Sequence, residues 1–183
     1  MTESATPITF SATLQRPAKP DGDAFWAFVL LPKEISEQLS RRGRVTVAAS
    51  LNEQNFQVTL EPDGQLSHWL RLSRQLCEMA GVQAGDSVSL EVMQLSQEPE
   101  PEVPADLHEA LQAAPAALAV WNGTTPLARL DWIHWITSAK QLKTRSKRIN
   151  DACDMLASGK QRVCCFDPSG YYSKAFCAPA AAD

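Results

Sequence analysis

The sequence lacks the segments that carry proteins into or across a membrane. No apolar run approaches the roughly 20 residues that a membrane-spanning helix needs. The first ten residues, MTESATPITF, have neither the basic start nor the apolar stretch of a signal peptide. We therefore expect no membrane contact and a cytoplasmic location.

Motifs for catalysis and metal binding are also missing. The histidines, His68, His108 and His134, are scattered, and the sequence shows no phosphate-binding loop, nucleophile–base pair or two-carboxylate motif. The five cysteines are odd in number and match no zinc or disulfide spacing. Cys164 and Cys165 could bind a soft metal or sense oxidation, but no C-x-x-C pair or nearby histidine completes a ligand set. We expect no catalytic residue, no cofactor and no metal.

The composition is that of an ordinary globular protein. Apolar residues make up 44% of the 183 positions and charged residues 21%, and this length suffices for one compact domain or two small ones. The net charge of −4, from 17 basic and 21 acidic residues, argues against a dedicated nucleic-acid or membrane-surface protein. This net charge does not argue against a basic patch confined to one segment.

The first half of the chain has the pattern of short strands. ITFSATLQ alternates apolar and polar residues, whereas AFWAFVLL is a continuous apolar run typical of a central strand. Pro32 ends that run and suits the first turn of a helix over KEISEQLSRR. Ser73 can cap a second short helix, RQLCEMA, and Gly81 can end it. The remaining predicted strands are RVTVAASL, FQVTL, HWLRL and SVSLEVMQL.

Two segments of this half are similar to each other. FVLLPKEISEQLSRRGRVTVA and HWLRLSRQLCEMAGVQAGDSVSLEV both predict a strand, a short helix, a glycine and a strand. The similarity is compatible with an internal repeat and equally with a chance likeness of two amphipathic helices. In a true repeat, each unit would leave an apolar face bare, and pairing the two units would close a β-barrel within one chain. We therefore predict a closed barrel over residues 1–95.

A charged connector precedes the second half. SQEPEPEVPAD, with three glutamates and three prolines, has little capacity to form a core, so residues 96–104 are predicted to be an acidic, proline-rich linker. From Asp106 onward the pattern is helical, and residues 105–183 are predicted to form a small all-helical module. Its aromatic tail, RVCCFDPSGYYSKAF, is expected to pack on that module. The predicted fold class is α+β.

Eight residues of the second half fall into the frame WI..AK...TR..RI: Trp135, Ile136, Ala139, Lys140, Thr144, Arg145, Arg148 and Ile149. Through this frame the second half resembles the YdeI/OmpD-associated family, which is also described as bacteriocin-protection-like. The first half, through LPKEI and VQAGDSV, resembles a small barrel family of unknown function that is similar to the AbrB-type double-split barrel. The resemblance implies a protective role or an association with a porin, and it names no reaction or catalytic residue.

The basic segment AKQLKTRSKRI is the main candidate site. Lys140, Thr144, Arg145 and Arg148 could contact an anion or a partner, because arginines three positions apart on a helix can hold a phosphate or carboxylate. In the alternative, which we favour, the lysines are solvated and the arginines contact partners within the chain. The acids available for this are Glu98, Glu100, Glu102, Asp106 and Glu109.

Arg41, Arg42 and Arg44 form a weaker candidate for phosphate contact. Residues 1–95 carry eight basic and eleven acidic side chains, and this net negative charge opposes DNA binding. Trp132 and Trp135 share a segment with many large apolar residues, which predicts burial for both rings.

These observations favour a non-enzymatic binding or stress-protection protein. An AbrB-like nucleic-acid-binding regulator is the alternative, and an enzyme acting on a small anionic substrate comes third. The expected partner is an unidentified protein or a small anionic ligand, and the chain is expected to be a monomer.

Overall fold

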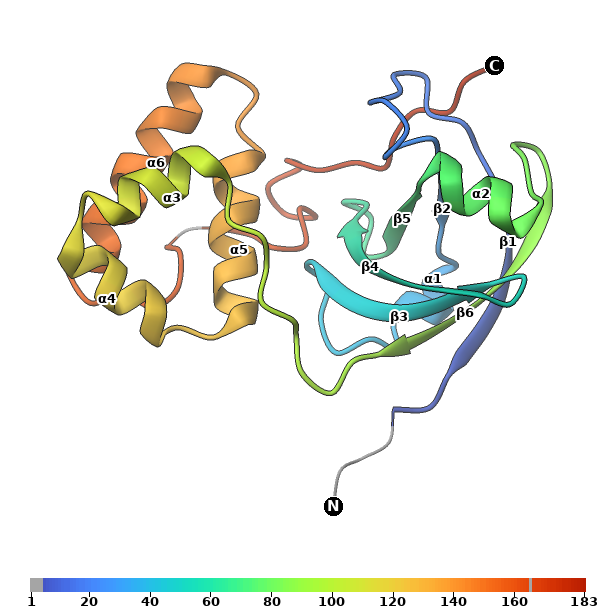
Figure 1. The fold of residues 1–183 in the computed structure, drawn as a ribbon, viewed down its shortest axis with the longest axis horizontal. Coiled ribbons are helices and arrows are strands. Elements are labelled where there is room, and N and C mark those ends of the chain that lie inside the picture. Colours follow the sequence, from blue (N-terminus) through green and yellow to red (C-terminus); the bar gives the residue numbers. More distant parts are fainter. Residues whose placement is uncertain (1–4, 165) are drawn as a thin grey trace. The chain divides into compact units, whose positions relative to one another are not determined.

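The structure is a computed structural model that describes residues 5–164 and 166–183. Its contacts divide the chain into two units (Figure 1). The first comprises residues 1–97 together with 167–183, and the second comprises residues 98–166. No helix among the described residues has the length and apolar character needed to cross a membrane.

The first unit is a nearly closed, six-stranded antiparallel barrel, so the protein belongs to the α+β class. The sheet order is β1-β6-β3-β4-β5-β2. A bridge between Gln15 and Phe28 joins the two ends of the sheet, with N···O distances of 3.0 and 2.9 Å. The strands are β1 (Ile8–Thr13), β2 (Ala27–Leu30), β3 (Val45–Leu51), β4 (Gln54–Pro62), β5 (His68–Leu72) and β6 (Ser87–Gln94).

Two strand–helix–strand segments build most of the barrel. The first is β2, α1 (Lys33–Ser36) and β3, and the second is β5, α2 (Arg74–Ala80) and β6. β2 pairs with β5 and β3 pairs with β6, both antiparallel, which is the pairing that two equivalent units would make. The barrel is therefore made by one chain, as the sequence similarity of the two segments suggested.

Helix α1 is shorter than the ten residues predicted. It ends at Ser36, which is 1% exposed and whose Oγ lies 2.6 Å from Nδ1 of the buried His68. The local pattern favoured a longer helix, but these contacts and the burial of Leu39 place the following residues in a turn.

The predicted start and end of the second barrel helix agree with the structure. The Ser73 hydroxyl accepts a hydrogen bond from the N–H of Leu76 at 3.2 Å, and Gly81 ends α2 with φ +69°. Asn52 and Glu53 form the two-residue hairpin between β3 and β4 with φ +47° and +67°, the left-handed conformation that such hairpins require.

The described part of the second unit contains four helices: α3 (Ala105–Gln112), α4 (Pro115–Gly123), α5 (Pro126–Thr137) and α6 (Leu142–Ala157). Helix α5 is buried on most sides, because apolar residues lie all round it. Trp132 is fully buried in this core, as predicted. Trp135 is only partly buried, and its ring contacts that of Trp132 edge-on at 6.3 Å.

The aromatic tail is divided between the two units, whereas the sequence suggested that it packs on the helices. Val163 packs against the helical core and the Phe166 ring lies 5.5 Å from that of His134, as expected, but residues 167–183 belong to the barrel unit. Ala18 N–H donates to the carbonyl of Ala180, and Ala182 N–H donates to that of Arg16, both at 2.8 Å. A Cβ on Gly64 would lie 2.1 Å from the carbonyl oxygen of Phe176, so only glycine permits this approach. The aromatic composition of the tail indicated that it packs, but could not show which core it packs against.

Candidate functional site

The candidate site predicted from the sequence lies at the start of α6. Gln141 is the N-cap residue and makes no side-chain capping bond, and the first turn contains no acidic residue. The four N–H groups that begin a helix have no partners inside it, so this end carries partial positive charge. Lys140 and Lys143 are exposed beside it, and Leu142 between them is 79% exposed.

Arg145 pairs with an acidic residue of the same chain. Its Nε and Nη2 donate to the two carboxylate oxygens of Asp106 at 2.7 and 3.0 Å, a bidentate pair. This hydrogen bond lowers the pKa of Asp106 below its ordinary value, despite the opposing effect of desolvation. Asp106 also lies in the first turn of α3, where a carboxylate is favourable.

Arg148 binds the end of α5. Its Nη1 donates to the carbonyl oxygen of Trp135 at 2.6 Å and to Oγ of Ser138 at 3.2 Å. Its guanidinium carbon lies 5.5 Å from the centre of the Trp135 ring. Both arginines therefore have the internal partners that the favoured interpretation required.

The remaining side chains of the segment are closer to solvent. Thr144 is half-buried, and Lys147 pairs with Asp151 at 2.6 Å on the exposed surface of α6. Such exposed pairs contribute about 0–1 kcal/mol. The structure thus separates the segment into internally bound arginines and exposed Lys140, Leu142 and Lys143.

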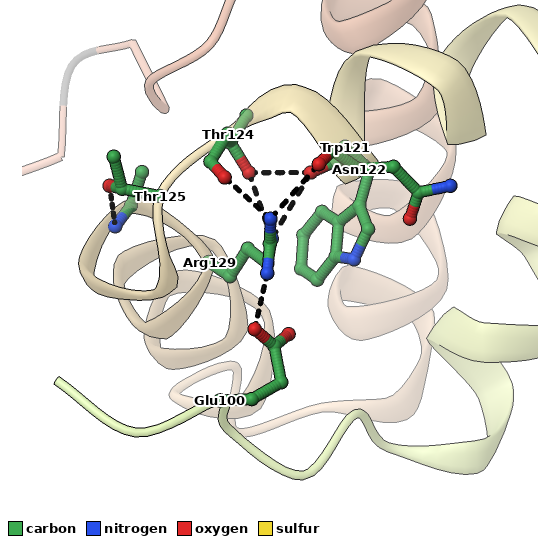
Figure 2. Close-up of polar contacts among 7 residues, drawn as sticks. Glu100, Trp121, Asn122, Thr124, Thr125 and Arg129 are labelled. Carbon is green, nitrogen blue, oxygen red and sulfur yellow. Dashed lines mark hydrogen bonds and ion pairs between the residues drawn. The ribbon is translucent and has the colours of Figure 1, made fainter.

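Arg129 forms a polar cluster that sequence reasoning missed. Figure 2 shows its guanidinium among the last residues of α4, the turn that follows and Glu100 of the acidic connector. Its Nε donates to the Trp121 carbonyl and to Oγ1 of Thr124, each at 3.1 Å, and Nη2 donates to the carbonyls of Asn122 and Thr124. Nη1 pairs with Glu100, and the arginine side chain is only 12% exposed. No local pattern in the sequence pointed to this cluster, because Arg129 and Glu100 are 29 residues apart.

The three barrel arginines of the weaker candidate, Arg41, Arg42 and Arg44, also contact groups of their own chain. Arg44 pairs with Glu61 at 2.8 Å, and Arg42 Nη1 donates to the carbonyl of Leu66 at 2.5 Å. Arg41 lies close to Gly43 and Pro168, where a Cβ on Gly43 would approach both side chains to 2.7 Å. These contacts therefore do not bring the three arginines together at one exposed anion site.

His68 is an ionisable residue of the barrel that is fully buried, at 0% exposure. Its Nε2 lies 2.9 Å from the carbonyl oxygen of Gly43, so Nε2 carries the proton and Nδ1 accepts from the Ser36 hydroxyl. Burial lowers the pKa of His68, although the Gly43 hydrogen bond opposes this effect. The neutral ring fits both partners, and its burial makes it a structural group.

Arginine–aromatic stacks occur elsewhere in the barrel and were not anticipated. The guanidinium carbons of Arg16 and Arg74 lie 3.7 and 4.8 Å from the centre of the Trp26 ring. Arg71 lies 4.8 Å from the ring of Phe25. Nε of Arg16 is buried and has no hydrogen-bond partner among the residues that the structure describes. These side chains are far apart in the sequence, so no local pattern could pair them.

No group of three or more histidine, cysteine, aspartate or glutamate side chains within the described residues could hold a metal ion. Cys164 is exposed, and Cys165 lies outside the described residues.

The geometry defines an α+β protein in which a nearly closed barrel precedes four helices braced by arginines. Comparison with family models gives two matches along the chain. Residues 100–159 match the family described as bacteriocin-protection, YdeI or OmpD-associated, and residues 10–92 match a domain of unknown function, DUF1905. Each of the two models covers less than half of the chain, and together they confirm the resemblance to the two families that was seen in the sequence. The comparison with curated proteins gives no match.

Proposed function

We propose that this chain is a binding protein rather than an enzyme, and that the start of α6 contacts an acidic segment of a partner protein. The observation that carries this proposal is the 79% exposure of Leu142 between two exposed lysines, Lys140 and Lys143. A small anion would need only the positive charge. The exposed leucine adds an apolar contact, which favours a protein partner.

The bound arginines support this assignment indirectly. Arg145 and Arg148 connect α6 to Asp106 and to the end of α5, so the first turn of α6 is held in place. An acidic partner at the uncapped N-terminus would meet the helix dipole as well as the lysines. Each such charge at a helix end is worth about 0.3–1 kcal/mol. Thr144 adds a hydroxyl donor beside the same turn.

Side chains that could act in catalysis are hydrogen-bonded to other groups of the chain, which favours a binding protein over an enzyme. The buried His68 and Ser36 bond to each other, and the Asp167 carboxylate accepts hydrogen bonds from Ser169, Tyr172 and Ser173. For the barrel, an AbrB-like relationship with nucleic-acid binding is the alternative, and the pairing of Arg44 with Glu61 weighs against it. A protective role and a cytoplasmic location stay predictions for this chain.

A defined acidic peptide tests the proposal. We would titrate the full chain with a fluorescently labelled peptide of alternating glutamate and leucine and measure anisotropy at two salt concentrations. We expect salt-sensitive binding that weakens about tenfold in Lys140→Glu/Lys143→Glu, because rim charges govern steering and complementarity. Leu142→Ser should weaken binding at both salt concentrations.

Lys33→Glu is the matched control, because Lys33 is an exposed lysine at the start of a helix in the barrel unit. It should leave the affinity unchanged, and thermal melts should show that all variants stay folded. Equal effects of the Lys33 and Lys140/Lys143 substitutions would refute the assigned site.

A further inference from the structure

Strand β1 has one paired edge and one open edge. Leu14 N–H donates to the carbonyl of Asp86 at 2.9 Å, and its carbonyl accepts from Gly85 at 2.8 Å, so Leu14 faces β6. Gln15 faces the opposite way and bonds with Phe28 of β2. Because backbone groups alternate along an antiparallel strand, Thr9 and Ser11 direct their N–H and C=O groups away from β6.

Strand β2 does not cover this edge. It pairs with β1 only through the Gln15–Phe28 bridge and then leads through Pro32 into α1. The backbone groups of Thr9 and Ser11 on this side have no partner among the described residues, and both residues are exposed. The strand, ITFSAT, contains no charge and no proline, the features that usually protect an open edge.

A groove lies beside the same edge. It has a volume of about 660 Å³ and is lined by residues 5–9, which include the start of β1, and by Ile35, Gln38 and Leu39 of α1 and the turn after it. The end of β6, at Gln94–Ser96, completes its lining, and none of the lining residues is charged. We call this the seam groove.

We propose that the seam groove binds an extended, uncharged peptide segment of a partner protein as an additional strand beside β1. Only an extended chain presents N–H and C=O groups at the spacing of Thr9 and Ser11. Its alternate side chains would enter the groove against Ile35 and Leu39, where a charged group would lose hydration without a partner. This site lies in the barrel unit and is independent of the site proposed on α6.

The backbone direction at Ser11 allows a sharp test. In Ser11→Pro the lost N–H is the outward one, so the barrel should keep its melting temperature within a few degrees. In Ala12→Pro the lost N–H faces β6, opposite Val88, so the barrel should be strongly destabilised. Equal destabilisation by the two prolines would overturn the assigned open edge.

A displayed library of random ten-residue peptides, selected on the immobilised full chain, serves as the binding probe. We expect enrichment of uncharged sequences with alternating β-branched residues. A selected peptide should slow hydrogen exchange at Thr9 and Ser11, and its affinity should fall at least tenfold in Ser11→Pro and in Gln38→Lys. Gln57→Lys, on the exposed surface of β4, should have no effect.

Three results would overturn the proposal. One is a library without enrichment, and another is a selected peptide that binds Ser11→Pro and Gln38→Lys as tightly as the unaltered chain. The third is concentration-dependent self-association that Ser11→Pro abolishes, because the edge would then pair with a second copy of the chain.

Discussion

The two units use their arginines differently. In the helical unit, Arg129 and Arg148 donate to carbonyl oxygens at the ends of α4 and α5. In the barrel, Arg16, Arg71 and Arg74 lie over aromatic rings. A helix leaves its last four carbonyls without internal partners, whereas a nearly closed sheet pairs most of its own.

This difference determines what each arginine stabilises. In the helical unit, the arginines complete the hydrogen bonding of the backbone and connect it to acids of the preceding connector, Glu100 and Asp106. In the barrel, the stacked arginines cover apolar ring surface with their stems and guanidinium groups, and Arg74 in addition pairs with Glu78 and Asp23 on the exposed surface. Replacing arginines should therefore cost more in the helices than over the aromatic rings.

The largest effect is expected at Arg129. Arg129→Ala removes every bond from the guanidinium to the end of α4 and to Glu100, and should lower the free energy of unfolding by about 2–4 kcal/mol. Chemical denaturation followed by circular dichroism at the helical signal measures this loss. Arg129→Lys should recover only part of it, because an ammonium group cannot reproduce the planar fork. A loss below 0.5 kcal/mol would contradict the comparison.

Arg148 should come next. Arg148→Ala removes the donor to the Trp135 carbonyl and the contact with the Trp135 ring, and should cost about 1–2 kcal/mol. Lys143→Ala, an exposed neighbour on the same helix, should change the free energy of unfolding by less than about 0.5 kcal/mol. Equal losses from the two substitutions in urea denaturation would show that Arg148 does not hold α5.

Acid should affect the barrel first. The folded state lowers the pKa of His68, so below about pH 6.5 the unfolded chain gains a proton that the folded chain resists. Stability is then lost as the pH falls, by at most about 1.4 kcal/mol per pH unit until the folded pKa is reached. In the helical unit the lowered pKa of Asp106 causes a corresponding loss of stability only in more acidic solution, as the pH falls below the ordinary carboxyl pKa of about 3.9.

Melting curves of the full chain between pH 7 and 5 test this order. The barrel transition should move while the helical transition stays in place, and His68→Gln should remove the pH dependence over that range. A pH dependence unchanged by His68→Gln would assign the effect to another group.

The smallest effect is expected at Arg16. Arg16→Met keeps an unbranched apolar stem on the Trp26 ring and removes a buried Nε that lacks a hydrogen-bond partner among the described residues. The free energy of unfolding should stay within about 1 kcal/mol of the original value, in contrast to Arg129→Ala. A loss of 2 kcal/mol or more in denaturant titration would mean that the barrel also depends on arginine charge.

Local sequence determined much of the secondary structure. Alternation in ITFSATLQ, the Ser73 and Gly81 helix signals and the apolar surroundings of Trp132 are short-range features, and the structure agrees with each. The basic segment and the nearby acids likewise indicated that Arg145 would find a carboxylate within the chain. Charge and hydropathy patterns carry this information because neighbouring positions on a helix or strand face the same surroundings.

Other features depended on tertiary structure. Helix α1 ends early because Ser36 contacts His68, 32 residues away. Arg129 meets Glu100 across 29 residues, and the tail packs on glycines of the barrel loops. The open edge of β1 exists only because β2 leaves the sheet after one bridge. The sequence by itself determined which segments are strands, helices and polar surfaces, whereas tertiary packing decided which distant groups meet, because those contacts depend on chain closure rather than on local periodicity.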